Sequence, residues 1–232
     1  MNQQLALSLP LKNQATLADF CWDKNTILKH EIQRALSYQG ERFITIWGGL
    51  GSGKTHLLQG ICQTAMQQHQ LDAMYLPLSI LKEWGPESIE GLSNQSLIAI
   101  DDMDAIAGCP EWENALFALF NQIYDNERTI LFTSNHTPPA ASAIHLPDLR
   151  SRLNWGLVIE LRELDDASKM NVLQDQAQKR GFDLPDGVAL FLIHRWSRNM
   201  NALHMILDKL DQASLAAQRK ITIPFVKAVL GI

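Results

Sequence analysis

The stretch from Trp47 to Leu58, "WGGLGSGKTHLL", constrains the fold of this chain more than any other. It follows the short β-rich run "RFITIW" and leads into a helix-like run, and it fits the pattern Gly, any four residues, Gly, Lys, then Ser or Thr. Glycines let a backbone curl so that several N–H groups point at phosphate oxygens, and the helix N-terminus adds partial positive charge. Lys54 would supply a full charge to the β- and γ-phosphates, and the Thr55 hydroxyl would ligate Mg²⁺. The loop therefore predicts a nucleotide site.

Two later apolar runs end in polar residues that fit the same site. "SLIAIDD" (96–102) is a continuous apolar strand ending in two acids, and "TILFTSN" (129–135) is a further strand. A buried strand ending in an acid places a carboxylate beside Mg²⁺, so we expect Asp101 to lie on the metal side and Asp102 to polarise an attacking water. Asn135 is a candidate for contact with the γ-phosphate or that water. Without the upstream loop, all three would be ordinary residues at strand ends.

Hydrophobic periodicity divides the chain into an alternating part and a helical part. Strands are expected at 42–47, 72–78, 96–102, 129–135 and 157–161, with helices at 26–36, 54–69 and 111–125. This alternation predicts an α/β fold with a buried parallel sheet flanked by helices. After Leu161 only helices are expected, at 165–181, 185–196, 201–218 and 222–231. The predicted domains are a flexible tail (1–14), a nucleotide-binding base domain (15–163) and a small all-helical lid domain (164–232).

Composition excludes several classes of protein. The 232 residues carry a formal net charge of −5, which is unlike a dedicated nucleic-acid binder with a basic stripe. The three cysteines form no CxxC pair, and the seven histidines show no zinc-ligand spacing. No apolar run approaches the roughly 20 residues of a membrane helix, and the N-terminus lacks the features of a signal peptide. We therefore expect a cytoplasmic protein with no membrane partner and no sequence-specific DNA binding.

Together these segments resemble the AAA+ ATPases, and among them the bacterial replication initiator DnaA. The resemblance runs from about Thr16 to the C-terminus. It is carried by "TLADFCWDKN", "GGLGSGKTHLLQG", "LIAIDDMDAIAG", "ILFTSNHTPP" and "LPDLRSRLNWGLVIEL". In that family the first segment wraps the nucleotide base, and the last places Arg152 at the position of an arginine finger that faces a neighbour's nucleotide. The resemblance implies an AAA+ P-loop fold with a helical lid.

The resemblance also assigns the remaining site residues. In the lid, the arginine expected to sense the γ-phosphate is replaced by Asn201, and Arg198 lies one turn earlier. This departure favours bound ADP over ATP, with Mg²⁺ as the metal and weak or no intrinsic ATPase activity. The expected nucleotide-binding residues are Trp22, Asn25, Gly49, Leu50, Gly51, Ser52, Gly53, Lys54, Thr55, His56, Asn135, Arg198 and Asn201. The expected metal ligands are Thr55 and Asp101, and the expected catalytic residues are Asp102 and Arg152, the latter acting in trans.

Within the DnaA-related proteins, the arrangement is similar to the Hda family, whose members act in the regulatory inactivation of DnaA. No DNA-reading helix-turn-helix domain follows the lid in this sequence, and only a short tail precedes the core. That tail, "QLALSLPL", resembles peptides that dock on the DNA polymerase III sliding clamp (beta subunit). Two registers are open: the motif begins at Gln4, or it is the "LSLPL" segment that docks. The residues concerned are Gln4, Leu5, Leu7, Leu9, Pro10 and Leu11.

The resemblance predicts a nucleotide-bound regulator that docks on the DNA-loaded clamp and promotes hydrolysis of ATP bound to DnaA, which prevents re-initiation of replication. Its expected partners are DnaA and the clamp, and a homodimer is possible. The main alternative is a self-acting AAA+ ATPase of helicase-loader or related replication type, because Lys54, Thr55 and Asp101 are all present. Without the resemblance, Arg152 would be read as an ordinary surface arginine.

Overall fold

The computed structural model describes residues 16–18, 20–217 and 219–231, apart from the side chain of Asn201. The contacts between residues divide the chain into two compact units. The first unit consists of residues up to Gly49 and of Lys54–Leu161, and the second consists of Leu50–Gly53 and Arg162–Ile232. Every strand and helix expected from periodicity is present, with bounds that differ by at most two residues. Within the described residues, no helix has the length and apolar character needed to cross a membrane.

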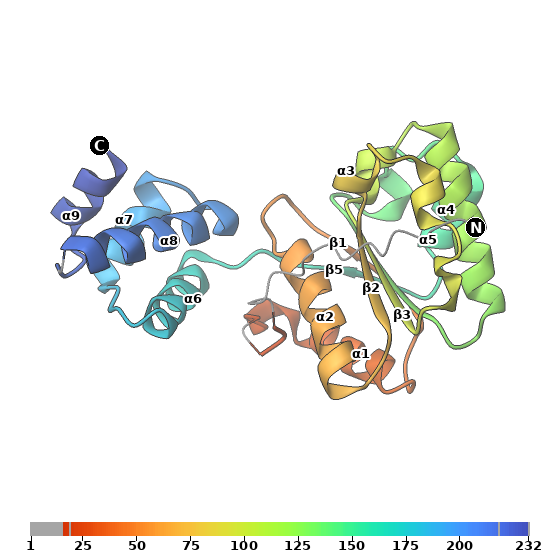
Figure 1. The fold of residues 1–232 in the computed structure, drawn as a ribbon, viewed down its shortest axis with the longest axis horizontal. Coiled ribbons are helices and arrows are strands. Elements are labelled where there is room, and N and C mark those ends of the chain that lie inside the picture. Colours follow the sequence, from red (N-terminus) through yellow and green to blue (C-terminus); the bar gives the residue numbers. More distant parts are fainter. Residues whose placement is uncertain (1–15, 19, 218, 232) are drawn as a thin grey trace. The chain divides into compact units, whose positions relative to one another are not determined.

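The first unit contains five strands and the helices that connect them (Figure 1). In chain order its elements are η1 (Asp23–Asn25), α1 (Thr26–Leu36), β1 (Phe43–Trp47), α2 (Lys54–Gln68), β2 (Ala73–Pro77), α3 (Leu78–Leu81), η2 (Pro86–Ile89), η3 (Leu92–Asn94), β3 (Leu97–Asp101), η4 (Met103–Ile106), α4 (Pro110–Asp125), β4 (Ile130–Asn135), η5 (Pro139–Ala141), α5 (Pro147–Leu153) and β5 (Leu157–Glu160). The short helices α3 and α5 and the 3₁₀ turns were not expected from periodicity.

All described strand pairs are parallel, in the order β2-β3-β4-β1-β5. Successive side chains of a strand point to opposite faces, and both faces of this sheet are covered. Leu97, Ala99 and Phe132 pack with α1 and α2 in one core, whereas Ile98 and Leu131 pack with α4 and α5 in another. Because β1, β3 and β4 are parallel neighbours, their carboxyl ends meet at one edge of the sheet.

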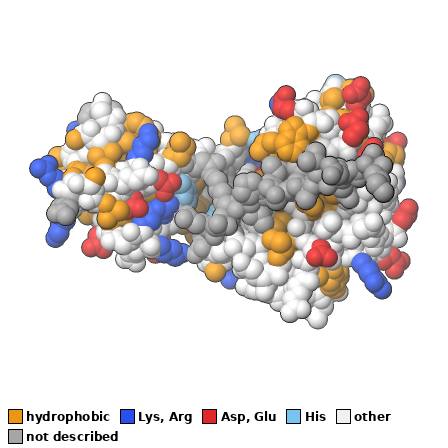
Figure 2. All heavy atoms as spheres, viewed as in Figure 1, with side chains coloured by type: hydrophobic (Ala, Val, Ile, Leu, Met, Phe, Trp, Pro, Cys, Tyr) orange, Lys and Arg blue, Asp and Glu red, His pale blue; other side chains and the backbone are white. Residues whose placement is uncertain are grey.

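The second unit has a core of its own. Its helices are α6 (Asp166–Lys179), α7 (Asp186–Arg195), α8 (Met200–Ala217) and α9 (Ile223–Leu230). Leu173, Leu192 and Leu207 are fully buried in this core. The Thr222 side chain accepts a hydrogen bond from the Phe225 backbone N–H and so caps the start of the last helix. On the face drawn in Figure 2, basic side chains lie scattered among acidic and apolar ones.

Candidate functional site: the strand tips and the α5 arginine

The glycine-rich loop joins β1 to α2, as the sequence predicted. Gly51 and Gly53 have φ angles of +80° and +100°, which residues with a Cβ rarely adopt. Lys54 begins α2 and is only 6% exposed, and its Nζ donates to the carbonyl oxygens of Gly48 (2.7 Å) and Gly49 (2.9 Å). Thr55 follows in the first turn of α2 and is exposed. The Lys54 ammonium group is therefore held against the backbone of the loop. Thr55 is the next residue in the sequence.

The end of β4 lies directly beside this loop. The Gly48 backbone N–H donates to the Asn135 carbonyl oxygen (3.1 Å), and Trp47 pairs with Asn135 in the sheet. Asn135 is fully buried, yet among the described residues neither its amide nitrogen nor its amide oxygen has a hydrogen-bond partner. Leaving a buried polar atom unpaired costs about 1–3 kcal/mol, so the Asn135 amide fits a site for a polar ligand.

Asp101, at the end of β3, is 1% exposed and is held by donors on several sides. Its carboxylate accepts hydrogen bonds from the hydroxyls of Tyr75 (2.7 Å) and Ser134 and from the Asp102 backbone N–H (3.1 Å). Burial, and then the negative charge of Asp101, raise the pKa of Tyr75 far above its usual value, so this hydroxyl stays a donor. The carboxylate is thus fixed at the sheet edge where a metal was predicted.

Asp102 differs sharply from its neighbour. Its backbone is left-handed (φ +57°, ψ +50°), and one of its carboxylate oxygens accepts a hydrogen bond from the Ser79 hydroxyl (2.9 Å). Non-glycine residues held in this region are strained by about 1–3 kcal/mol and cluster at functional sites. The left-handed turn separates Asp102 from the strand geometry of Asp101, so the two acids occupy different environments.

The segment before α1 places aromatic rings next to α2. The Phe20 ring lies 4.6 Å from the Trp22 ring and stacks at 5.9 Å on His56, which follows Thr55. The Trp22 indole N–H donates to the Leu17 carbonyl oxygen (3.2 Å), and Asn25 is 4% exposed. The structure thus brings Trp22 and His56, which were predicted to contact a nucleotide, into one aromatic group.

The predicted lid residues lie in the second unit. Arg198 donates to the Asp166 carboxylate (3.0 Å), and His194 lies 3.9 Å from the same carboxylate. Asn201 is in α8, and its side chain lies outside the described residues. The predicted clamp-binding residues, numbers 4 to 11, also lie outside them.

Arg152 is on α5, in the first unit. Its guanidinium carbon lies 3.6 Å from the Trp155 ring centroid and 5.5 Å from that of Phe117. The side chain is half-buried, and its Nε atom is buried without a hydrogen-bond partner among the described residues. Aromatic rings, rather than a carboxylate, therefore surround this cation in the described structure.

Two buried polar groups anchor the ends of α5. The Glu113 carboxylate, 2% exposed, accepts hydrogen bonds from the backbone N–H groups of His145 (3.0 and 3.1 Å) and Leu146 (2.6 Å), just before α5, and from that of Gly108 (2.7 Å), just before α4. The Thr45 hydroxyl donates to the carbonyl oxygen of Leu153, the last residue of the helix (2.8 Å). The helix that carries the arginine is therefore tied to α4 at its start and to β1 at its end.

Sequence reasoning missed Tyr75, Ser134 and Glu113. Ser134 directly precedes Asn135 and could have been noticed from that position alone. Tyr75 and Glu113 act through contacts with residues 26 and 32 positions away, which no local pattern encodes. Their roles become visible only once the sheet is assembled.

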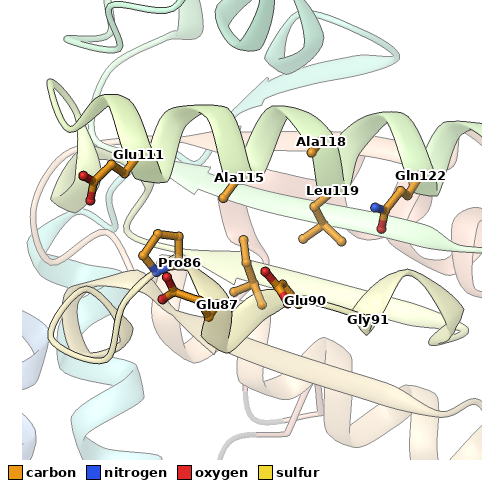
Figure 3. Close-up of a pocket in the computed structure, with 10 residues that line it drawn as sticks. Pro86, Glu87, Glu90, Gly91, Glu111, Ala115, Ala118, Leu119 and Gln122 are labelled. Carbon is orange, nitrogen blue, oxygen red and sulfur yellow. The ribbon is translucent and has the colours of Figure 1, made fainter.

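A separate hollow of about 460 Å³ lies between η2 and α4 (Figure 3). Its lining includes the apolar side chains of Ile89 and Leu119 and the acidic side chains of Glu87, Glu90 and Glu111. None of the residues predicted to bind nucleotide or metal lines this hollow. The strand-tip residues, which combine buried unpaired groups with a glycine loop, are the better candidate for a ligand site.

Two family models match this chain. The model described as bacterial DnaA ATPase domain matches residues 11–160, and the model described as Hda, lid domain, matches residues 166–230. A protein of Haemophilus influenzae described as uncharacterized is 43% identical over 232 residues, covering 100% of both chains.

Solved structures agree with the fold. Domain III of the replication initiation protein DnaA from Thermotoga maritima superimposes with a TM-score of 0.81 at 23% identity, covering 96% of this chain and 98% of that one. AMPPCP-bound DnaA from Aquifex aeolicus superimposes with a TM-score of 0.73 at 20% identity, covering 89% and 68%. The predicted AAA+ fold, with a parallel sheet flanked by helices and a C-terminal helical lid, is confirmed.

Proposed function

The chain belongs to the family of bacterial DnaA ATPase domains, and from that premise we propose that it is a nucleotide-bound regulator that promotes hydrolysis of ATP held by DnaA. The match of its C-terminal helices to the Hda lid supports a DnaA-related replication regulator. The outcome of this activity would be that DnaA is returned to its ADP form and re-initiation of replication is prevented.

The strand tips supply the groups that a bound nucleotide requires. Lys54 and the loop N–H groups would hold its phosphates, Thr55 and Asp101 would hold Mg²⁺, and the unpaired Asn135 amide has both a donor and an acceptor to offer. When bound, the metal and phosphates would supply the charges that balance Lys54 and Asp101. The ring group of Trp22 and His56 is the candidate contact for the base.

The lid supports ADP as the resident nucleotide. Asn201 stands where the family's sensing arginine is expected, and an amide carries no charge to pair with a γ-phosphate. The guanidinium of Arg198, the nearest basic side chain in the sequence, is ion-paired with Asp166. We therefore propose that the nucleotide serves mainly to support the structure and is turned over slowly or not at all.

The observation that carries the proposal is the place of Arg152 relative to the chain's own phosphate loop. Trp155 packs edge-on against Phe43, at the start of β1, whereas the loop begins at Gly48, after its end. Five residues of extended strand span roughly 16 Å. An arginine anchored near the start of this strand is well placed to act on a nucleotide held by another chain, and such a finger is worth about 10³–10⁵ in rate.

We further propose that the N-terminal tail docks the chain on the DNA-loaded sliding clamp. An extended peptide with alternating leucines and a proline can lay apolar side chains into a groove at low ordering cost. The two registers differ in whether Gln4 or the "LSLPL" segment enters the groove. Replacing Leu5 and Leu9 separately, and measuring binding to the clamp, would distinguish them.

The decisive experiment mixes the chain, ATP-bound DnaA and DNA-loaded clamp, and follows conversion of the DnaA-bound ATP to ADP. Arg152→Ala should reduce the rate by about 10³-fold or more while nucleotide binding by this chain persists. Arg128→Ala, which removes a cation from an exposed loop, is the matched control and should leave the rate unchanged. Removal of residues 1–11 should abolish the dependence on clamp. Full activity of Arg152→Ala would exclude the proposed role.

A second candidate, a self-acting ATPase, is favoured by one observation. Lys54 follows the loop after β1, and Asp101 and Asn135 end the neighbouring strands β3 and β4, so groups that a hydrolytic site uses come from one edge of the sheet. Turnover by the purified chain alone at about 1 s⁻¹ or faster would favour this function over the regulator. A salt-dependent shift of single-stranded DNA would further favour the helicase-loader type.

A further inference from the structure

We propose that Trp155 is the positioning residue of Arg152 and holds the guanidinium in an aromatic cradle made of Phe43, Phe117, Tyr124 and Trp155. The role of this cradle in catalysis rests on the proposed function of Arg152 as a finger that acts on another chain. The cradle itself is a claim about this chain alone, and it can be tested without any partner.

The central contact is a stacked pair of side chains. A distance of 3.6 Å between the guanidinium carbon of Arg152 and the Trp155 ring centroid is well inside the roughly 6 Å limit for a cation–π contact. Trp is the aromatic residue that attracts cations most strongly, and Arg stacks on such rings through its planar guanidinium. Phe117 contributes a second ring at 5.5 Å. Two rings therefore restrict where the end of this flexible side chain can lie.

The Trp155 ring is itself fixed by its neighbours. It lies 4.8 Å from the Tyr124 ring and meets the Phe43 ring edge-on at 6.1 Å. The Trp155 backbone N–H donates to the Arg152 carbonyl oxygen (2.9 Å). The next residue, Gly156, has a φ of +64°, and a Cβ there would collide with the Phe43 carbonyl oxygen. The chain can therefore turn closely against β1, which places the indole under the arginine.

An aromatic cradle suits a finger better than an ion pair does. A carboxylate would hold the guanidinium equally well but would neutralise the charge that must stabilise a transferring phosphoryl group. Rings restrict the side chain through their faces and leave its charge available. Burial of the Arg152 Nε atom without a partner is consistent with a side chain that is held by stacking. Positioning matters because a misplacement of about 1 Å can cost 10²-fold in rate.

The first test measures the contact directly in the full chain. Arginine Nε–H resonances are recorded after selective ¹⁵N labelling, and the Arg152 signal is assigned by its loss in Arg152→Lys. We expect the wild-type signal to be shifted upfield by the indole ring current, to return to the usual arginine position in Trp155→Ala, and to remain partly shifted in Trp155→Phe. Trp84→Ala is the matched control, because Trp84 is 56% exposed on another part of the same unit. An unshifted signal, or one that Trp155→Ala leaves in place, would overturn the cradle.

The second test measures DnaA-bound ATP hydrolysis as a function of the concentration of each variant. Trp155→Ala should lower the maximal rate by about 10²-fold with a smaller change in the half-saturating concentration, and Trp155→Phe should restore most of the rate. Because Trp155→Ala also removes packing, its stability is measured by urea unfolding. If Trp155→Ala is unfolded under the assay conditions, the positioning role is judged from the activity of Trp155→Phe instead. Loss of activity in Arg152→Ala with full activity in Trp155→Ala would overturn the positioning role alone. Full activity of Arg152→Ala would instead overturn the proposed function.

Discussion

Replacing Glu113 with Gln tests the anchoring of α5 most sharply. Glu113 comes early in α4, and its carboxylate accepts hydrogen bonds from three backbone N–H groups, those of Gly108, His145 and Leu146. Glutamine has nearly the same shape but keeps one acceptor oxygen and presents an NH₂ group to the other donors. The substitution therefore removes the negative charge. It also leaves at least one backbone N–H group facing the NH₂ group of glutamine, where no hydrogen bond can form.

The magnitude follows from those bonds. Hydrogen bonds to a charged group contribute about 1.5–3 kcal/mol each, and an unsatisfied buried donor costs about 1–3 kcal/mol. Loss of one to two such bonds predicts a destabilisation of the first unit of about 3 kcal/mol, reduced if water reaches the exposed His145. Urea unfolding followed by tryptophan fluorescence measures it, and amide exchange at Leu146 reports the local effect. Because the chain has two units, the transitions are fitted separately.

The control for this substitution is Glu111→Gln, two residues earlier on the exposed side of the same helix turn. It removes an equal charge near the helix N-terminus, and we expect it to cost no more than about 0.5–1 kcal/mol. A destabilisation by Glu113→Gln no larger than that of Glu111→Gln would refute the reasoning that this carboxylate fastens the segment leading to α5.

The Glu113 carboxylate should also make the stability of the first unit depend on pH. Burial alone would raise the pKa of Glu113, but the bonds from the His145, Gly108 and Leu146 N–H groups outweigh burial, and its pKa is lowered from the usual 4.5. A carboxylate with a lowered folded-state pKa adds stability above the unfolded-state pKa and loses it as the pH falls through the folded-state value. The difference in stability between wild type and Glu113→Gln should therefore be constant near pH 7 and shrink below about pH 4.5. A difference that grows with acidification would contradict it.

Three further substitutions test the other anchors and the phosphate loop. Thr45→Val leaves the carbonyl of Leu153 and the hydroxyl of Thr133 without a partner, and urea unfolding should show a loss of about 1–3 kcal/mol. Lys54→Ala should weaken binding of a fluorescent adenine nucleotide by about 10²-fold, which corresponds to about 2.7 kcal/mol; unchanged binding would mean that the loop does not hold phosphate. Gly156→Ala should destabilise the first unit by about 1–3 kcal/mol because of its left-handed φ and the Phe43 carbonyl, whereas a neutral effect in thermal unfolding would show that the turn can relax.

The sequence was sufficient to predict the sheet and the polar residues at its carboxyl edge. The strands are apolar runs bounded by turn residues, so Asp101 and Asn135 were expected at strand ends, and they lie at the ends of the neighbouring strands β3 and β4. Lys54 was expected at the start of the helix that follows the glycine loop, and it begins α2. Their roles toward a ligand stay predictions. Helix α5 was not expected as a separate element. It has only seven residues, too few for helical periodicity, although Pro147 at its first position and the acid that follows are helix-start signals.

The surroundings of Arg152 could not be predicted, for a physical reason. The cradle joins residues 43, 117, 124 and 155, and contacts at such separations depend on how β1, α4 and α5 pack together. Glu113 is a similar case. An acid in the first turn of a helix usually interacts with the helix dipole at the surface, whereas this one is buried because it satisfies backbone donors on another segment.

Strand β1 connects the two parts of the first unit that the proposals concern. Its start contributes Phe43 to the arginine cradle, its centre fixes the end of α5 through Thr45, and its end leads into the glycine loop that precedes Lys54. A buried central strand paired on both sides is a stiff element, because moving it would disrupt two ladders at once. The position of Arg152 should therefore depend on the integrity of the sheet and not on occupation of the phosphate loop. In Lys54→Ala, the Arg152 Nε–H resonance should stay where it is in the wild type even though nucleotide binding is weakened by about 10²-fold. A displaced resonance in that variant would mean that the phosphate loop and Arg152 move together, and it would contradict the inference that β1 holds Arg152 in place.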